Sequence, residues 1–171
     1  MHSAPVAEPE TIAAPAPAPT VRPGAKYDFG ELSTEDQVQH GLNLFLPLKN
    51  PAQFPALGAA LAAKMADTQA ALKSLHYVHF ARFVPTPDYS QLIVITEYDG
   101  DLKSYVMDFV AVLGDVFNTI LEFVQGAPPL PVQQFPAEFW RFVQAHNVPA
   151  DPWSAYPHMT VIDILRARRP R

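Results

Sequence analysis

The chain has 171 residues, a formal net charge of −5 at pH 7 and no cysteine. This length suffices for one domain and is too short for two ordinary ones. The absence of cysteine excludes disulfides, thiolate metal sites and a cysteine nucleophile, and the acidic balance argues against a nucleic-acid surface, which needs a basic patch. We therefore expect a single cytoplasmic domain that binds no nucleic acid.

The N-terminal stretch is rich in alanine and proline and poor in large apolar side chains. Its prolines are Pro5, Pro9, Pro15, Pro17, Pro19 and Pro23. Such a composition buries too little apolar surface to order the chain, so residues 1–26 are predicted to form a disordered tail. The stretch lacks the basic and apolar blocks of a secretory signal, and no part of the chain reaches the roughly 18 uninterrupted apolar residues of a membrane-spanning helix. We expect no transmembrane segment.

The first regular elements are a strand and a helix. Residues 42–46 alternate leucines with Asn43 and Phe45, which predicts a strand whose leucine face turns toward helices. Asn50 and Pro51 then provide the N-cap and the first-turn proline of a helix that continues to Leu75 with apolar residues at helical spacing.

The middle of the chain predicts a β-hairpin that leads into a long helix. Residues 76–84 and 91–98 read as two strands, joined by a turn over residues 85–90 that contains two prolines and an aspartate. From Asp101 to Val124 the apolar residues keep helical spacing, and Gly126 provides a stop. A shorter helix is predicted over residues 136–146, and the β-branched run 159–165 predicts a last strand.

The order of these elements is typical of a ferredoxin-like α+β fold. It predicts a βαββαβ antiparallel four-stranded sheet with two long helices on one face and an extra short helix before the last strand. This domain covers residues 27–165. The arginines of residues 166–171 form a predicted basic tail, with an anionic partner as the less common alternative.

The helix-free face of the predicted sheet is the candidate site. Alternation places His79 and Phe83 on one face of the second strand and Arg82 on the other, and the sequence does not decide which face is open. We interpret His79 as an acid/base group oriented by the carboxylate of Asp163. The predicted ligand-binding residues are Asn43, Phe45, Arg82, Phe83, Tyr98 and Trp140. The alternative is a subunit interface in which these polar groups satisfy one another.

Two further groups invite a ligand hypothesis. Glu97, Asp99 and Asp101 alternate in sequence and suggest a cation site, although an aspartate between a strand and a helix more often caps the helix. His146 follows several aromatic residues and is a candidate haem ligand, with a helix C-terminal cation as the alternative. No motif specifies another metal site.

The strand, turn and helix from His79 to Phe109, with the element order of residues 41–165, resemble the dimeric α/β-barrel superfamily. This group includes cofactor-free monooxygenases of the antibiotic-biosynthesis type, chlorite dismutase-like proteins and dye-decolourising peroxidases. The resemblance implies a homodimer that binds an apolar or aromatic small molecule, with oxidative or isomerising activity. It also admits haem, although Tyr98-Asp99-Gly100 is only a fragment of the GxxDG segment of the peroxidases. The other hypothesis is a non-catalytic interaction module that uses the sheet face and the proline-rich segments.

Overall fold

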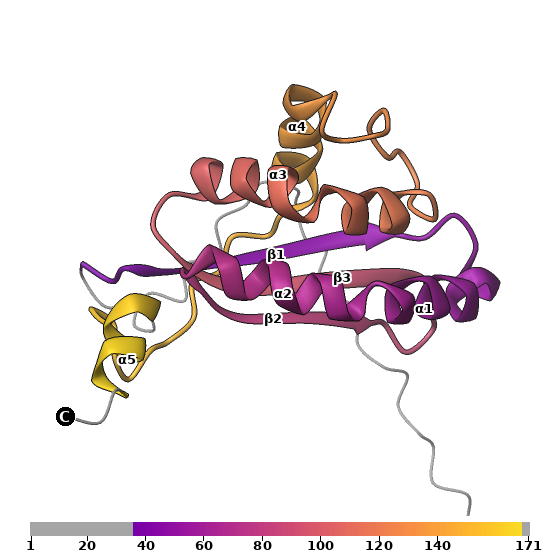
Figure 1. The fold of residues 1–171 in the computed structure, drawn as a ribbon. Coiled ribbons are helices and arrows are strands. Elements are labelled where there is room, and N and C mark those ends of the chain that lie inside the picture. Colours follow the sequence, from indigo (N-terminus) through magenta and orange to yellow (C-terminus); the bar gives the residue numbers. More distant parts are fainter. Residues whose placement is uncertain (1–35, 169–171) are drawn as a thin grey trace, which may run out of the picture.

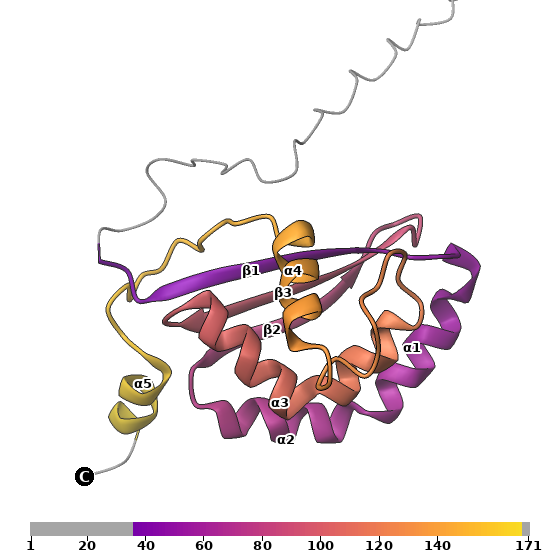
Figure 2. The same ribbon diagram turned by 90° about the horizontal axis from the view of Figure 1, so that it is seen from above.

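A three-stranded antiparallel sheet with strand order β1-β3-β2 organises the fold (Figures 1 and 2). The computed structural model describes residues 36–168. Its elements are β1 (Gln39–Pro47), the 3-10 turn η1 (Pro51–Gln53), α1 (Phe54–Ala63), α2 (Met65–Leu75), β2 (Val78–Pro85), β3 (Gln91–Asp99), α3 (Leu102–Leu121), α4 (Pro136–His146) and α5 (Val161–Ala167). The predicted tail of residues 1–26 lies outside the described residues.

The helices α1, α2 and α3 cover one face of the sheet (Figure 2). Leu42, Leu44 and Leu46 of β1 are buried on that face, as their alternation predicts. In the register of the sheet Leu44 lies opposite Val94 of β3, which is buried on the same side. The core therefore fills the space between this face and the helices, and no helix within residues 36–168 covers the opposite face (Figure 2).

The long helix α3 provides most of the buried residues of the helical layer. Asp101 caps it, because its carboxylate accepts a hydrogen bond from the Ser104 amide at 2.9 Å. Ten of its residues are buried. Among the described residues α3 alone has the length and composition to cross a membrane, but 56% of that stretch is buried inside the fold, as in the core helix of a soluble protein. A transmembrane segment is thus not shown.

The helix predicted to run from residue 51 to Leu75 is divided into two. Asn50 caps the turn η1, with its side chain accepting from the Ala52 amide at 3.0 Å, and α1 follows directly. The chain leaves helical geometry at Lys64, and α2 begins at Met65. The apolar spacing continued through this point, so periodicity alone gave no indication of the break.

The predicted last strand is wrong, because residues Val161–Ala167 form the helix α5. Thr160 and Asp163 form a capping box that starts this helix, each side chain bonding to the backbone of the other. These local hydrogen bonds outweigh the β-preference of the branched side chains. The sheet therefore has three strands, and the four-stranded ferredoxin-like topology and the dimeric barrel built from it are not supported.

An irregular segment closes the outer edge of β1. The Val148 amide donates to the Asn43 carbonyl at 2.9 Å, and the Asn43 amide donates to the side-chain oxygen of Asn147 at 2.9 Å. The side chain of Asn43 donates to the carbonyls of Val148 and Ala150, each at 3.2 Å. This segment lies where a fourth strand would have paired, so only β2 presents a free sheet edge within residues 36–168.

Candidate functional site

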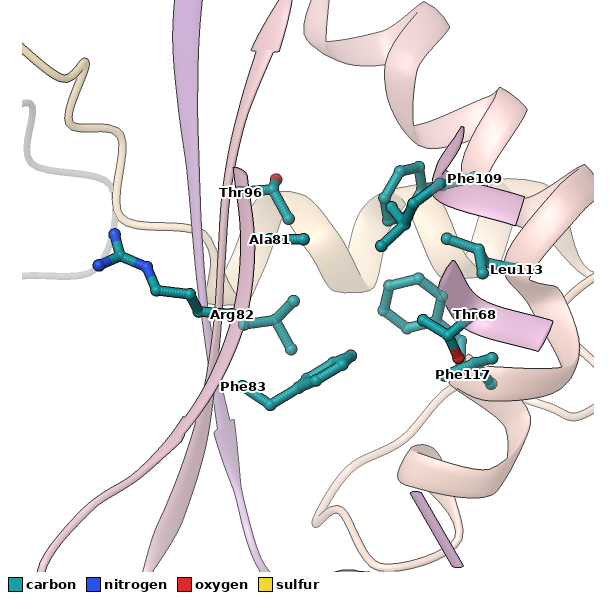
Figure 3. Close-up of a pocket in the computed structure, with 11 residues that line it drawn as sticks. Thr68, Ala81, Arg82, Phe83, Thr96, Phe109, Leu113 and Phe117 are labelled. Carbon is teal, nitrogen blue, oxygen red and sulfur yellow. The ribbon is translucent and has the colours of Figure 1, made fainter. Parts of the chain in front are cut away.

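The hairpin register shows which side of β2 faces the helices. Ala81 lies opposite Thr96 and Phe83 lies opposite Val94. Thr96 and Val94 are buried beneath the helices. Arg82 lies opposite Ile95, on the helix-free face. Figure 3 shows the same arrangement, with the Arg82 side chain pointing away from the helical layer. Phe83 therefore does not reach the open face, and Arg82 does.

A β-bulge brings His79 to the open side as well. The pairing of β2 with β3 shifts between Val78 and Phe80, so one extra residue enters β2 at that point. Regular alternation would place His79 and Arg82 on opposite faces of the strand. The extra residue interrupts this alternation, so both side chains can lie on the same side. Both residues line the same hollow in the structure.

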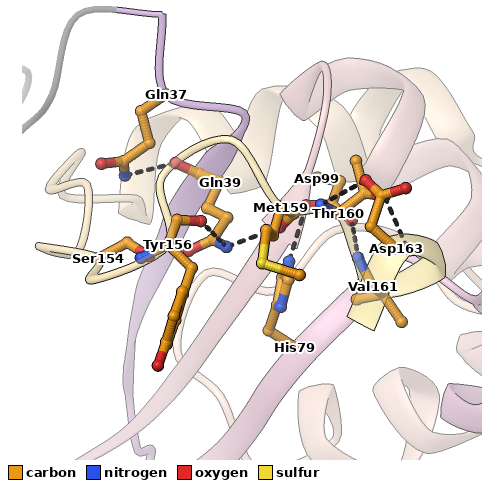
Figure 4. A network of polar contacts seen from close by, with 10 residues as sticks. All are labelled: Gln37, Gln39, His79, Asp99, Ser154, Tyr156, Met159, Thr160, Val161 and Asp163. Carbon is orange, nitrogen blue, oxygen red and sulfur yellow. Dashed lines mark hydrogen bonds and ion pairs between the residues drawn. The ribbon is translucent and has the colours of Figure 1, made fainter. Parts of the chain in front are cut away.

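His79 pairs with Asp99 and not with Asp163. Its Nε2 donates to Oδ1 of Asp99 at 2.7 Å, and the two side chains are only 7% and 11% exposed. The other oxygen of Asp99 accepts the Val161 amide at 2.8 Å, at the start of α5 (Figure 4). One carboxylate thus orients the imidazole and anchors the first residue of α5 beside the end of β3, so the predicted histidine–carboxylate pair exists with a different carboxylate.

Asp163 instead belongs to the capping box at the start of α5. Its Oδ2 accepts from the hydroxyl of Thr160 at 2.7 Å and from the Thr160 amide at 3.1 Å. These hydrogen bonds lower the pKa of the Asp163 carboxyl, because they stabilise its charged form. The side chain is exposed and has no hydrogen bond to His79, which removes its predicted orienting role.

The hollow on the open face has a volume of about 440 Å³. Phe80 of β2 and Trp153 line it, with exposures of 67% and 66%. Its polar lining includes Gln39, His79, Arg82 and Glu97. An exposed aromatic pair beside a few polar groups is what a binding site for an apolar ligand offers.

Glu97 contributes an incompletely satisfied carboxylate to this hollow. Its Oε1 accepts from the Arg82 guanidinium at 3.3 Å, and the Arg82 side chain is largely exposed. Its Oε2 is buried and has no hydrogen-bond partner among residues 36–168. A buried acceptor without a donor is unfavourable, so this carboxylate has capacity for a further hydrogen bond.

Two glutamines hold the segment that carries Trp153. Gln37 donates through its side chain to the Pro152 carbonyl at 2.9 Å. The buried side chain of Gln39 donates to the carbonyls of Tyr156 and Met159, at 3.1 and 2.9 Å (Figure 4). These contacts fix residues 152–159 beside the beginning of β1. Gln39, Phe80 and Trp153 were not among the predicted site residues, because the hollow joins residues far apart in the chain.

Two other predicted residues lie on or beside the open face but outside this hollow. Phe45 is half-buried on β1, on the side opposite the leucines. Asn43 fastens the segment 147–150 to the edge of β1, as described above. Both lie where alternation predicted, and neither lines the hollow.

Three predicted ligand-binding residues lie on the helical side. Tyr98 is buried and stacks on Tyr105 of α3, with ring centroids 4.0 Å apart. Phe83 borders an internal gap of about 20 Å³ beneath α2 and α3 (Figure 3). Trp140 lies on α4, which packs against α3 and β1, and is partly buried against the core. The structure therefore separates these residues from His79 and Arg82.

His146 ends α4 and has partners within its own helix. Its ring stacks on Phe142 with centroids 4.1 Å apart, and its Nδ1 lies 2.9 Å from the Phe142 carbonyl, to which it can only donate. Haem binding stays a prediction. Within residues 36–168 no three histidine, aspartate or glutamate side chains are grouped as a metal site.

The alternating acids Glu97, Asp99 and Asp101 have three different roles. Glu97 contacts Arg82, Asp99 bonds to His79 and the Val161 amide, and Asp101 caps α3. The capping interpretation of Asp101 is confirmed.

Comparison of the chain with protein-family models, with curated protein sequences and with solved structures gave no match.

Proposed function

We propose that the protein binds an apolar or aromatic small molecule in the hollow on the helix-free face of the sheet. The observation that carries this proposal is the exposure of Phe80 and Trp153 around one hollow of about 440 Å³. This volume falls within the roughly 300–1,000 Å³ typical of small-molecule sites. Covering two exposed aromatic rings supplies hydrophobic free energy to the complex.

The polar groups of the hollow give the ligand an orientation. Arg82 offers guanidinium N–H donors, and Glu97 offers acceptor capacity. The bond from Nε2 of His79 to Asp99 leaves Nδ1 as the remaining polar atom of the ring. For the oxidative or isomerising activity that the resemblance implies, we assign His79 as the acid/base group and Asp99 as the orienting carboxylate.

The chain has two tryptophans, which allows a direct test. In a Trp140→Phe background Trp153 is the only tryptophan, and its emission reports on the hollow. We expect 3-phenylpropionate, phenethylamine and their naphthyl analogues, titrated one by one, to include ligands that shift this emission to shorter wavelength and saturate. Phe80→Ser should weaken that binding about tenfold, the size expected for one lost aromatic contact.

Val112→Ser is the matched control, because Val112 is an exposed apolar side chain on α3, away from the sheet. It should leave the affinity unchanged. An emission spectrum that no probe alters, or an equal loss of affinity in both variants, would show that the hollow is not a ligand site.

A second candidate function is association through the same face, as a homodimer or as an interaction module. Phe80 and Val84 are exposed there, beside the half-buried Phe45, Ile93 and Ile95. Apolar surfaces of this kind often mark protein contacts.

Light scattering on the Val84→Lys variant tests association through this face, since Val84 does not line the hollow. A dimer that dissociates in this variant with small-molecule binding retained supports association, and a wild-type monomer rejects self-association.

A further inference from the structure

A second hollow lies on the other side of Phe80. It has a volume of about 300 Å³ and is bordered by the end of α2, the beginning of β2 and α5. Most of its lining is apolar: Leu72, Val78, Phe80, Ala81, Val161 and Leu165. Leu165 is 46% exposed, so the apolar surface is open at the α5 side.

The ionisable side chains of this groove are all basic. They are Lys73 and His76 at the end of α2 and His79 of β2, and no carboxylate of the described part of the chain lines the groove. His79 is already bonded to Asp99, and Nδ1 of His76 donates to the Ser74 carbonyl at 2.7 Å, which leaves Nε2 of His76 for a ligand. Lys73 is exposed and forms no ion pair with any residue of the described part. The chain has a net charge of −5 with histidine counted as neutral, and on the same count Lys73 makes the lining of the groove positive.

The surroundings of the groove extend the same pattern. The exposed Arg166 follows Leu165 on α5, and Arg168 ends that helix. Two acids lie near the groove: Asp99 is bonded to His79 and to the Val161 amide, and Asp163 accepts two hydrogen bonds from Thr160 and interacts electrostatically with Arg166. An apolar trough with basic groups at its rim is complementary to a molecule with one hydrocarbon chain and one anionic end.

We infer that this groove binds a single-chain fatty acid. The hydrocarbon chain lies along the apolar lining between β2 and α5, and the carboxylate contacts Lys73 and His76. A salt bridge to an exposed lysine is weak by itself, so the hydrocarbon chain supplies most of the affinity and the basic rim selects the head group. This inference does not rest on the proposed function, because the groove shares only His79 and Phe80 with the first hollow.

Calorimetric titration of the full chain with decanoate, decanol and decyltrimethylammonium, all below their micelle-forming concentrations, tests the head-group preference. The three probes share a chain length and differ in charge. Non-specific attraction to a protein of net charge −5 favours the cation. We expect saturable binding of one decanoate, about tenfold tighter than binding of the cation. Equal or tighter binding of the cation or of decanol overturns the inference.

Charge-matched variants locate the site. Lys73→Gln should remove most of the preference for decanoate, whereas Lys103→Gln, which makes the same charge change at an exposed position on α3, should not. Leu165→Ser should weaken all probes, and Trp153→Ser, in the first hollow, should weaken none. Equal effects of the two lysine variants, or a loss in Trp153→Ser alone, assign the binding elsewhere and overturn the inference.

Discussion

At the scale of single residues, hydrogen bonds to the backbone decide which acids are available for chemistry. Asp163 and Asp101 begin helices, and the hydrogen bonds that they accept lower the pKa of both carboxyls. Asp99 accepts one bond from an imidazole and one from a helix N-terminus. The only carboxylate of the hollow with unused acceptor capacity within the described residues is Glu97.

The capping role of Asp163 and Thr160 gives a prediction for α5. Thr160→Ala removes the N-cap, and such a loss typically costs about 1 kcal/mol of helix stability. Hydrogen exchange of the α5 amides should therefore become several-fold faster, while Thr160→Ser, which keeps the hydroxyl, should exchange like the wild type. Unchanged exchange in Thr160→Ala would contradict the capping box.

The same cap depends on pH in a defined direction. The pKa of Asp163 is lower in the folded chain than its ordinary value of 3.8. The stabilisation is therefore present above pH 3.8 and is lost as the pH falls through the lowered pKa of the folded state. The difference in exchange between Thr160→Ala and the wild type should accordingly shrink in strongly acidic solution.

At the scale of elements, close contact between β1 and the segment 147–151 replaces a fourth strand. Gly41 makes this contact possible, because a Cβ at that position would collide with the carbonyl of Ala150. The Gly41 amide also donates to the Asp151 side chain at 3.1 Å. The absence of a Cβ at residue 41 is thus a requirement of the closed sheet edge.

Two Gly→Ala changes should have opposite effects on stability. Gly41→Ala forces the segment away from β1 and breaks hydrogen bonds, so the free energy of unfolding should fall by about 1–3 kcal/mol. Gly58→Ala, in α1, meets no atom within 4 Å and should raise it by about 0.5–1 kcal/mol. Urea unfolding of the two variants checks both signs. Equal stability of Gly41→Ala and the wild type would show that the segment is not packed on β1.

At the scale of the whole molecule, stacked tyrosines join the sheet to α3. Tyr105 stacks on Tyr98 and donates its hydroxyl hydrogen to Thr96 at 2.7 Å. Burial raises the pKa of both tyrosine hydroxyls above their ordinary value of 10, because the charged form loses its hydration. The folded state therefore favours the neutral form of both hydroxyls.

The fold should consequently lose stability in alkaline solution. Because the tyrosine pKa values are raised in the folded state, these hydroxyls ionise first in the unfolded chain. The stability that the neutral hydroxyls contribute is therefore complete below pH 10 and declines as the pH rises toward the pKa values of the folded state. Tyrosinate absorbance and circular dichroism should therefore show part of the titration coinciding with unfolding. Tyr98→Phe, which removes one ionisable hydroxyl, should unfold at higher pH. Complete tyrosine titration without loss of structure would contradict this account.

The local pattern of the chain was sufficient for several elements. Alternation located β1, β2 and β3, helical spacing located α3 and α4, and Asp101 correctly indicated a cap. It failed at residues 159–165, where β-branched composition suggested a strand and the Thr160–Asp163 pair started a helix. It also failed at His79, because a bulge changes the face of a side chain without any mark in the alternation.

By itself the sequence determined the hairpin, the buried leucine face of β1 and the long helix α3, because periodicity and caps act over a few neighbouring residues. Only the tertiary structure decided that Asp99 is the partner of His79, that the segment 147–151 closes the sheet, and that Trp153 borders the hollow. The bond that fastens the sheet edge joins Asn43 to Val148, 105 positions apart. Pairings of this kind depend on how all the elements pack together, and no short stretch of sequence contains them.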